Sequence, residues 1–334
     1  MENYVIIREI GRGAYGRAFK AISHRNNSHV VIKQVKLRGM DKRELSNTLN
    51  EVKVLRSLQH INIIRHFDSY EHDGSLCIVM EYAASGDLQG RITSMRVSRS
   101  HFAERQLSAW IKQLLSALSF LQSRCIIHRD LKPQNIFVSS AGDRLMIGDF
   151  GVCKVLQSKS DLASTITGTP YYLSPEIFQG RPYSTKSDIW SLGCIIYELV
   201  ALRVPFDATD FRSLGILITR GGNPPFPSQY SRDLRDVFQE CVRRDYRSRP
   251  DADQLLARAY FQTRDTKHLP TKPTRSLSPY RTASARTSSR PATVTSGVRT
   301  RSASPYGRAM SPQRCLRIPP TSPKPHSRIL RLLQ

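Results

Sequence analysis

The order of apolar patterns along the chain is the feature that most constrains its fold. Strand-like runs come first, at residues 4–10, 29–35 and 76–82. Longer runs with apolar residues at helical spacing follow, at 103–123 and 187–202. An early strand-rich part and a later helix-rich part predict two lobes with a cleft between them.

The apolar pattern stops after Phe261, and the remaining residues, 262–334, are rich in Ser, Thr, Pro and Arg. Counted from Thr263, they hold fifteen Lys or Arg against one acid, Asp265, and so supply +14 of the net charge of +24. Such a segment offers too little apolar surface to offset its chain entropy. A folded domain over 4–261 and a disordered basic tail are therefore predicted.

Composition also narrows the class of protein. A chain of 334 residues, 39% of them hydrophobic, can bury the core of one two-lobed domain. No run approaches the roughly 18 to 20 apolar residues of a membrane helix, and the first residues, MENYVIIREIGRG, do not read as a secretory signal. The six cysteines form no C-x-x-C pair, so a disulfide framework or zinc site has little support. We expect a cytoplasmic or nuclear protein.

The run HRDLKPQNIFV, residues 128–138, places basic side chains around an acid and an amide five residues after it. Asp130 is suited to accept a hydrogen bond from an attacking hydroxyl and to take its proton. Lys132 can balance charge on a transferred phosphoryl group, and Asn135 offers a carbonyl oxygen to a magnesium ion. Asp149, in GDFG, adds the second hard oxygen ligand that Mg²⁺ prefers. The run predicts phosphoryl transfer.

A glycine-rich segment near the start, GRGAYG, has the spacing G-x-G-x-x-G in Gly11, Gly13 and Gly16. In dinucleotide-binding folds this motif ends a strand and opens a helix. Here the strand-like runs RAFKAIS and VVIKQV follow, so the glycines are predicted to lie in a hairpin. Lys33 lies on the second of these strands, and Glu51 on the next amphipathic helix can reach back to it. Taken alone, this pair would more often be a solvated surface pair.

These motifs, in this order, resemble the signature set of eukaryotic protein kinases. The resemblance covers about residues 4–261 and implies the α+β, bilobal kinase fold, with a strand-rich N-lobe at about 4–82 and a helical C-lobe at about 86–261. The implied cofactors are ATP and Mg²⁺, with Mn²⁺ as an alternative metal.

The resemblance also assigns roles to the residues of the chemical site. It implies that Lys33 contacts the α and β phosphates of ATP, with Glu51 as its helix partner. Asp130 is the implied catalytic base, with Lys132 beside it, and the implied metal ligands are Asn135 and Asp149. His128 is matched to a packed position of the internal spine. The implied structural anchors of the larger lobe are Asp188 and the pair of Glu176 with Arg249.

The ATP pocket is implied in the same way. Met80 matches the gatekeeper, residues 81–83 match the hinge whose backbone meets adenine, and Asp87 matches the residue that contacts the ribose. Ala18 and Val31 replace the family's usual valine and alanine in the roof over adenine, so one gains the volume that the other loses. The implied cofactor-binding residues are Ile10, Gly11, Gly13, Gly16, Ala18, Val31, Lys33, Met80, Glu81, Ala83, Asp87 and Phe137.

Finer features indicate the type of kinase. Lys132 followed by Pro133 is the serine/threonine form of the loop, Thr169 in GTPYYLSPE agrees, and Val152 favours threonine as the phosphoacceptor. The segments QNIF, YYLSPE, LGCIIYEL and PSQYSRDL resemble the NIMA-related kinases, a family tied to mitosis, centrosomes and cilia. This implies transfer of the ATP γ-phosphate to protein Ser/Thr hydroxyls in regulation of the cell cycle, the centrosome or basal body, or the cilium or flagellum. The alternative is a catalytically weak kinase-fold scaffold whose basic tail binds an acidic polymer.

Regulation is expected at two places. The guanidinium of Arg129 matches a phosphate bidentately, and alignment with the subfamily selects Thr165 as its partner. Phosphate on Thr165, placed by the protein itself or by an upstream kinase, should order the loop and raise activity. In the tail, four serines precede proline and are candidate sites for proline-directed kinases: Ser278, Ser304, Ser311 and Ser322.

The tail itself suggests a partner. A basic, proline-punctuated segment can bind microtubules or another acidic polymer through counterion release, which weakens steeply with salt. Phosphorylation would loosen such binding, and a solvated tail without a partner is the alternative. No heptad pattern runs through the tail, so a monomer is expected.

Overall fold

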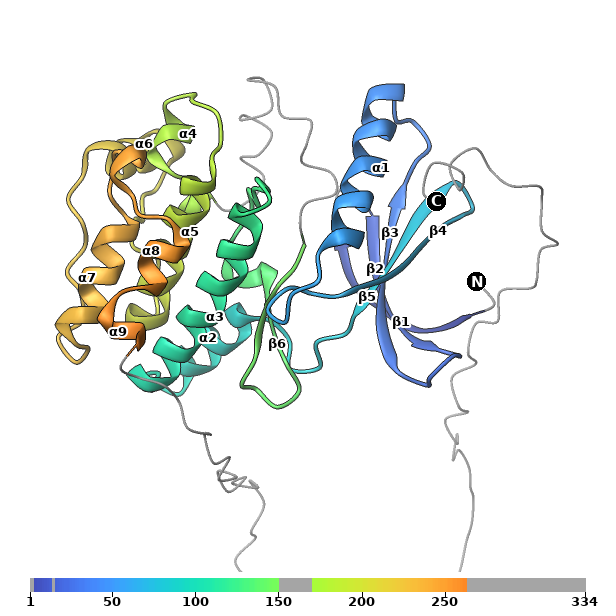
Figure 1. Ribbon diagram of the computed structural model, residues 1–334, viewed down its shortest axis with the longest axis horizontal. Helices are drawn as coiled ribbons and strands as arrows, with labels where there is room; N and C mark the ends of the chain where they lie inside the picture. The colour runs from blue at the N-terminus through green and yellow to red at the C-terminus, as the bar shows by residue number, and fades with distance from the viewer. Residues whose placement is uncertain (1–2, 14–15, 150–169, 263–334) are drawn as a thin grey trace, which may run out of the picture. The chain divides into compact units, whose positions relative to one another are not determined.

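The computed structural model describes residues 3–13, 16–149 and 170–262 of the chain. Its N-lobe is a five-stranded antiparallel sheet with one helix lying along it, as Figure 1 shows. Along the sheet the strand order is β1-β2-β3-β5-β4. The elements are β1 (Tyr4–Gly13), β2 (Gly16–Ser23), β3 (His29–Lys36), α1 (Lys42–Ser57), β4 (His66–His72) and β5 (Ser75–Glu81).

Alternation along β5 divides the N-lobe core between the two faces of the sheet. Leu76 and Ile78 pack with Val35, Leu49 and Val52, two of which lie on α1. The intervening residues, Cys77 and Val79, belong to a cluster on the other face. Because side chains alternate along a strand, α1 covers only one of the two faces.

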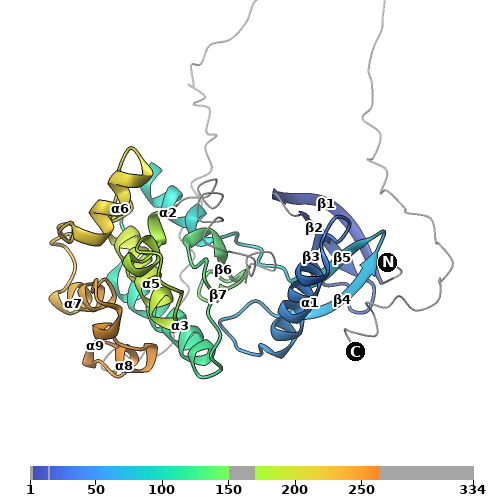
Figure 2. The same ribbon diagram turned by 90° about the horizontal axis from the view of Figure 1, so that it is seen from above.

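The C-lobe is mainly helical, and its elements follow in the order drawn in Figures 1 and 2. They are α2 (Leu88–Val97), α3 (Glu104–Gln122), β6 (Ile136–Val138), β7 (Leu145–Ile147), α4 (Pro175–Phe178), α5 (Thr185–Ala201), α6 (Phe211–Arg220), α7 (Arg232–Cys241), α8 (Ala252–Leu256) and α9 (Ala259–Gln262). Helix α5 is buried over most of its length, with α7 packed against it, while α8 packs against α3. A membrane-spanning helix is not found in the described part of the chain.

The predicted order of strands before helices, and with it the α+β fold of two lobes, is confirmed. The helix expected at 103–123 is α3, and the helix expected at 187–202 is α5. Strand β4 was not predicted, because its sequence, HFDSYEH, is polar. A strand at the edge of a sheet pairs on one side only, so its sequence need not be apolar. The predicted tail lies outside the described residues except for Gln262.

Candidate active site

Three predicted catalytic-loop residues meet at the carboxylate of Asp130. The Nζ of Lys132 lies 3.0 Å from Oδ2 and 3.2 Å from Oδ1 of Asp130. The amide nitrogen of Asn135 donates to Oδ2 at 3.0 Å and to the Asp130 carbonyl oxygen at 2.7 Å. With its nitrogen committed to Asp130, Asn135 has its carbonyl oxygen as the atom suited to a cation.

The loop is held in place by a buried carboxylate on α5. Asp188 accepts hydrogen bonds from the backbone nitrogens of His128, at 2.8 Å, and Arg129, at 3.1 Å. Burial raises the pKa of Asp188, although these hydrogen bonds act in the opposite direction. Arg129 has a φ of +68°, a strained conformation for a residue with a side chain. The anchor predicted at Asp188 thus holds the loop backbone at the strained residue and at the residue before it.

Asp149 follows a glycine, Gly148, at a closely packed position where a larger residue would displace neighbouring side chains. A Cβ added to Gly148 would lie 2.7 Å from the Ile64 side chain and 2.9 Å from the Phe137 ring. The Gly148 carbonyl oxygen lies 3.1 Å from Nε2 of His128, which ties this segment to the catalytic loop. Asp149 itself has a φ of +54°. Its carboxylate is therefore placed by close packing on one side and by the loop on the other.

Lys33 reaches Asp149 from β3 and forms an ion pair with it. Burial alone would raise the pKa of Asp149, but the charge and hydrogen bond of Lys33 hold that pKa below its usual value. Both side chains keep access to solvent, with 27% of Lys33 and 43% of Asp149 exposed. The predicted partner, Glu51, lies on α1, and its side chain is outside the description.

The residues expected above the nucleotide share one face of the sheet. Ala18 pairs with Lys33, and Met80 pairs with Val31, in neighbouring strands. Val31 and Lys33 are two residues apart on β3, so both point to the face that α1 covers. Ala18 is then the diagonal neighbour of Val31 on this face. A smaller side chain at residue 18 can therefore make room for a larger one at residue 31.

The glycine hairpin is confirmed. Gly11 pairs with Ala18, and Gly13 pairs with Gly16, across β1 and β2. A Cβ on Gly16 would lie 2.0 Å from the carbonyl oxygen of Gln34, so a larger residue would force the strands apart. Ile10, just before the hairpin's first glycine, is 39% exposed.

The ribose and floor positions also come together. Asp87 caps α2 by accepting a hydrogen bond from the Gly90 nitrogen at 2.8 Å. It forms an isolated β-bridge with Phe137, and the Val138 nitrogen donates to the Gly86 carbonyl oxygen at 2.9 Å. The segment after the hinge therefore lies directly beside β6, which carries Phe137.

Away from the loop, Glu176 and Arg249 form a closed ion pair. Arg249 donates from both terminal nitrogens to the two Glu176 oxygens, at 2.8 and 2.7 Å, and Ser187 adds a bond of 2.8 Å. Burial alone would raise the pKa of Glu176, but Arg249 holds it below its usual value. The pair matches the predicted anchor and has no access for a substrate, since Glu176 is 2% and Arg249 1% exposed.

Sequence reasoning missed a second buried contact on α5. The Tyr172 hydroxyl donates to Glu198 at 2.5 Å, and the Ser191 hydroxyl donates to the Tyr172 carbonyl oxygen at 2.9 Å. A small cavity beside it is lined by Tyr172, Arg129 and Asp130, among others. The signal that could have revealed the contact is a glutamate inside the apolar run LGCIIYELVA.

Some predicted residues fall outside the described ranges. Val152, Thr165 and Thr169 lie in 150–169, and the four tail serines lie in 263–334.

Comparison with known proteins gives consistent matches. The family described as "Protein kinase domain" matches residues 4–261. The chain is 42% identical over 259 residues to the probable serine/threonine-protein kinase nek3 of Dictyostelium discoideum, covering 77% of this chain and 23% of that protein. It is 40% identical over 269 residues to the mouse serine/threonine-protein kinase Nek1, covering 80% of this chain and 22% of that protein. With the Caenorhabditis elegans kinase nekl-2 it shares 39% identity over 264 residues, 77% of this chain and 74% of that protein. The chain thus spans less than a quarter of the first two relatives.

Proposed function

Because the chain belongs to the protein kinase family and, within it, to the NIMA-related (Nek) serine/threonine kinases, we propose that it transfers the γ-phosphate of ATP to protein Ser/Thr hydroxyls. One observation carries the proposal. The Asp130 carboxylate is held by Lys132 and Asn135 in a loop whose backbone is fixed to α5. This is the geometry that a general base for a hydroxyl needs.

Asp130 acts on the substrate hydroxyl in this proposal. Its carboxylate accepts the hydrogen bond of the attacking hydroxyl, orients it and takes its proton as transfer proceeds. Lys132, within 3.2 Å of both carboxylate oxygens, balances the negative charge that grows on the phosphoryl oxygens. Protein kinases depend mainly on such positioning and charge stabilisation.

The donor set fits magnesium. Asn135 and Asp149 offer an amide oxygen and a carboxylate, the hard ligands that Mg²⁺ prefers, and Mn²⁺ accepts the same set. Bound Mg²⁺ would neutralise phosphate charge during transfer. Lys33, now in contact with Asp149, is the cation for the α and β phosphates, and Glu51 on α1 is its proposed second partner.

The nucleotide pocket follows from the same arrangement. Bound adenine would lie between the roof residues Ala18 and Val31 and the floor residue Phe137, with Met80 at the back. The backbone of Glu81 and Ala83 would hold its ring. The hairpin that carries Gly11, Gly13 and Gly16, with Ile10 just before it, would cover the phosphates, and Asp87 would bind the ribose.

Regulation and partners extend the proposal. The strained backbone of Arg129 supports a role in binding a phosphate on Thr165, whether placed by the protein itself or by an upstream kinase. The tail serines are sites for proline-directed kinases, and the tail binds microtubules or another acidic polymer. We place the protein in the cytoplasm at the cytoskeleton, centrosome or basal body, with the nucleus as an alternative, and as a monomer.

The test is phosphate transfer from labelled Mg·ATP to casein or a histone mixture, with identification of the labelled amino acid. Wild type is expected to label serine or threonine, and Asp130→Asn to lose about 100-fold or more of the rate. Asp236→Asn, the same change at an exposed position of α7, serves as the control and should match wild type. Equal transfer by Asp130→Asn and wild type would contradict the assignment of the base. No transfer by wild type, even after treatment with an upstream kinase, would favour the scaffold.

A further inference from the structure

Arg144 joins three separate segments of the chain. It lies in the turn between β6 and β7, in the C-lobe. Its Nη2 donates to Oε1 of Glu81 at 2.7 Å, and its Nη1 donates to the carbonyl oxygen of Ile61 at 3.0 Å. Glu81 ends β5, and Ile61 lies in the loop between α1 and β4. One guanidinium therefore connects the C-lobe hairpin to two parts of the N-lobe.

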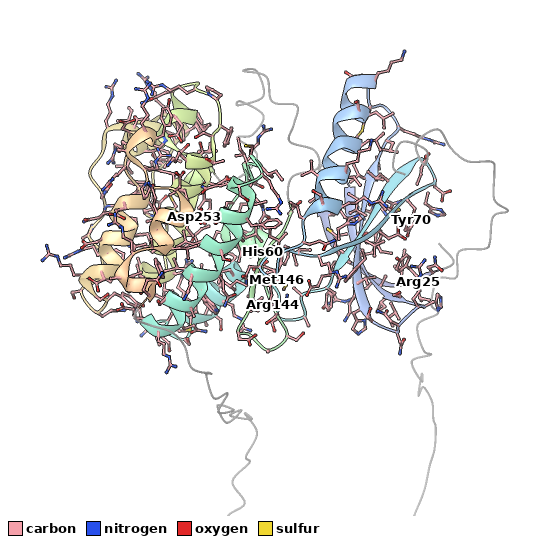
Figure 3. All side chains as sticks on the ribbon, in the orientation of Figure 1. Arg25, His60, Tyr70, Arg144, Met146 and Asp253 are labelled. Carbon is pink, nitrogen blue, oxygen red and sulfur yellow. The ribbon has the colours of Figure 1, made fainter. Side chains whose placement is uncertain are left out.

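The loop that carries Ile61 is itself tightly fixed. The amide nitrogen of Asn62, a residue only 5% exposed, donates to the Leu145 carbonyl oxygen at 2.8 Å and to Gln113 at 3.0 Å. Backbone bonds of 2.9 and 2.8 Å join Ile147 to Asn62 and Ile64. Figure 3 labels His60, Arg144 and Met146 in this region. The Ile61 carbonyl is thus a rigid support for the guanidinium.

Glu81 is held at both its backbone and its side chain. Its nitrogen donates to the Arg65 carbonyl oxygen at 2.9 Å, and its carboxylate receives Arg144. The two side chains are 24% and 34% exposed, so the pair is partly shielded from water. A guanidinium that bridges two acceptors in fixed geometry is more specific than an exposed surface pair.

We propose that Arg144 is a positioning residue for the nucleotide. By holding Glu81 against the fixed loop, it sets the backbone of residues 81–83, where adenine binds. The inference rests on the proposed function, because it needs ATP at this hinge. It assigns a role in nucleotide affinity to the β6–β7 turn, in addition to the roles of the proposed catalytic residues.

The test compares Arg144→Ala, Arg144→Lys and Glu81→Gln in the full chain. It measures KM for ATP and for casein, and the Kd of Mg·ADP by calorimetry. Arg144→Ala is expected to raise KM for ATP and Kd for ADP about five- to tenfold, the loss expected for one ordinary hydrogen bond. KM for casein should stay within about twofold, because the protein-substrate side is not touched. Arg144→Lys keeps the positive charge, on a single nitrogen in place of the guanidinium fork, and should give a smaller rise.

A double variant separates positioning from general damage. Since Arg144 acts through Glu81, Arg144→Ala combined with Glu81→Gln should be no worse than the poorer single variant. Arg258→Ala is the matched control, because Arg258, between α8 and α9, pairs with Glu240 on α7, away from the hinge. It should leave both nucleotide constants unchanged.

Three results would overturn the inference: unchanged nucleotide constants in Arg144→Ala, additive effects in the double variant, or an equal change in Arg258→Ala. If Arg144→Ala does not fold, Arg144→Lys and Glu81→Gln decide in its place. Failure of wild type to bind Mg·ADP would remove the proposed function as well. Wild-type binding without an effect of Arg144 would remove this inference alone.

Discussion

Two ion pairs of this protein have opposite surroundings. In the C-lobe, Arg249 and Glu176 are sealed from water, and Arg249 also donates to the carbonyl oxygens of Arg243 and Lys186, at 2.7 and 2.8 Å. Lys33 and Asp149 form a pair with roughly a quarter and two fifths of their side chains exposed. Asp149 also has a positive φ.

The difference separates structural charges from chemical ones. A buried pair with every donor used has nothing left to offer a ligand, and removing one partner leaves an uncompensated charge. A pair that water reaches, such as Lys33 with Asp149, contributes less to stability because its charges are screened. Its two groups can also give up their mutual contact to bind phosphate and metal. The two pairs should therefore respond to mutation in opposite ways.

The largest effect on stability is expected at the closed pair. Arg249→Met should lower the free energy of unfolding by about 3 to 5 kcal/mol, because Glu176 would be left buried without its partner. Urea unfolding followed by circular dichroism measures this. A loss below about 1 kcal/mol would show that the pair does not hold the C-lobe in the way that its burial indicates.

The pair of Lys33 and Asp149 should show the reverse, with a large effect on activity and a small one on stability. Lys33→Met should reduce phosphate transfer about 100-fold, because a cation for the phosphates is lost. Its unfolding free energy should change by less than about 1 kcal/mol, because water reaches both side chains and screens their charges. The same urea titration and the transfer assay check both numbers. A loss of stability comparable to that of Arg249→Met would contradict the contrast.

The contact between Tyr172 and Glu198 should give an intermediate result. Both residues are buried, at 6% and 3% exposed, so Tyr172→Phe removes one of the hydrogen-bond donors to a buried carboxyl group. We expect a loss of about 1 to 3 kcal/mol in unfolding free energy. Tyr197→Phe, which removes a hydroxyl bonded to the Pro225 carbonyl at 3.1 Å, is the matched control and should cost less. Equal losses of unfolding free energy in the two variants would mean that the carboxyl partner of Tyr172 adds no stability beyond that of a carbonyl partner.

The smallest effect is a pH dependence at Glu198. Burial raises the pKa of Glu198, although hydrogen bonds from Tyr172 and Gln89 act against the rise. The folded protein therefore keeps this proton to a higher pH than the unfolded chain, and stability falls as pH rises from the ordinary value of 4.5 to the raised one. In Glu198→Gln this side chain does not titrate. The Tm of the variant minus that of wild type should therefore increase over that pH range and then level off. A constant difference in Tm would contradict the raised pKa.

Sequence patterns over a few neighbouring residues predicted the elements whose structure is determined locally. The hairpin of Gly11 and Gly16 and helices α3 and α5 could be found because their signals are short or periodic. The edge strand β4 was missed because its polar sequence lacks the apolar pattern of a buried strand. Local reasoning cannot pair residues that are far apart in the chain.

Distance along the chain explains what sequence reasoning missed in the site. Arg144 meets Glu81 across 63 residues, and nothing in the turn sequence AGDR marks that partner. Glu176 and Arg249 are 73 residues apart, and only the family resemblance indicated that they pair. The contact of Lys33 with Asp149 was not predicted either, although both residues were assigned to the site.

The most direct test of the central claim measures binding and transfer on the same preparations of wild type and Asp130→Asn. Calorimetry gives the Kd of Mg·ADP, and a single turnover at saturating Mg·ATP gives the transfer rate to casein. If Asp130 acts on the substrate hydroxyl, the variant should bind nucleotide within about threefold of wild type and transfer at about a hundredth of its rate or less. Transfer at the wild-type rate with unchanged binding would contradict the account of this loop as the catalytic centre.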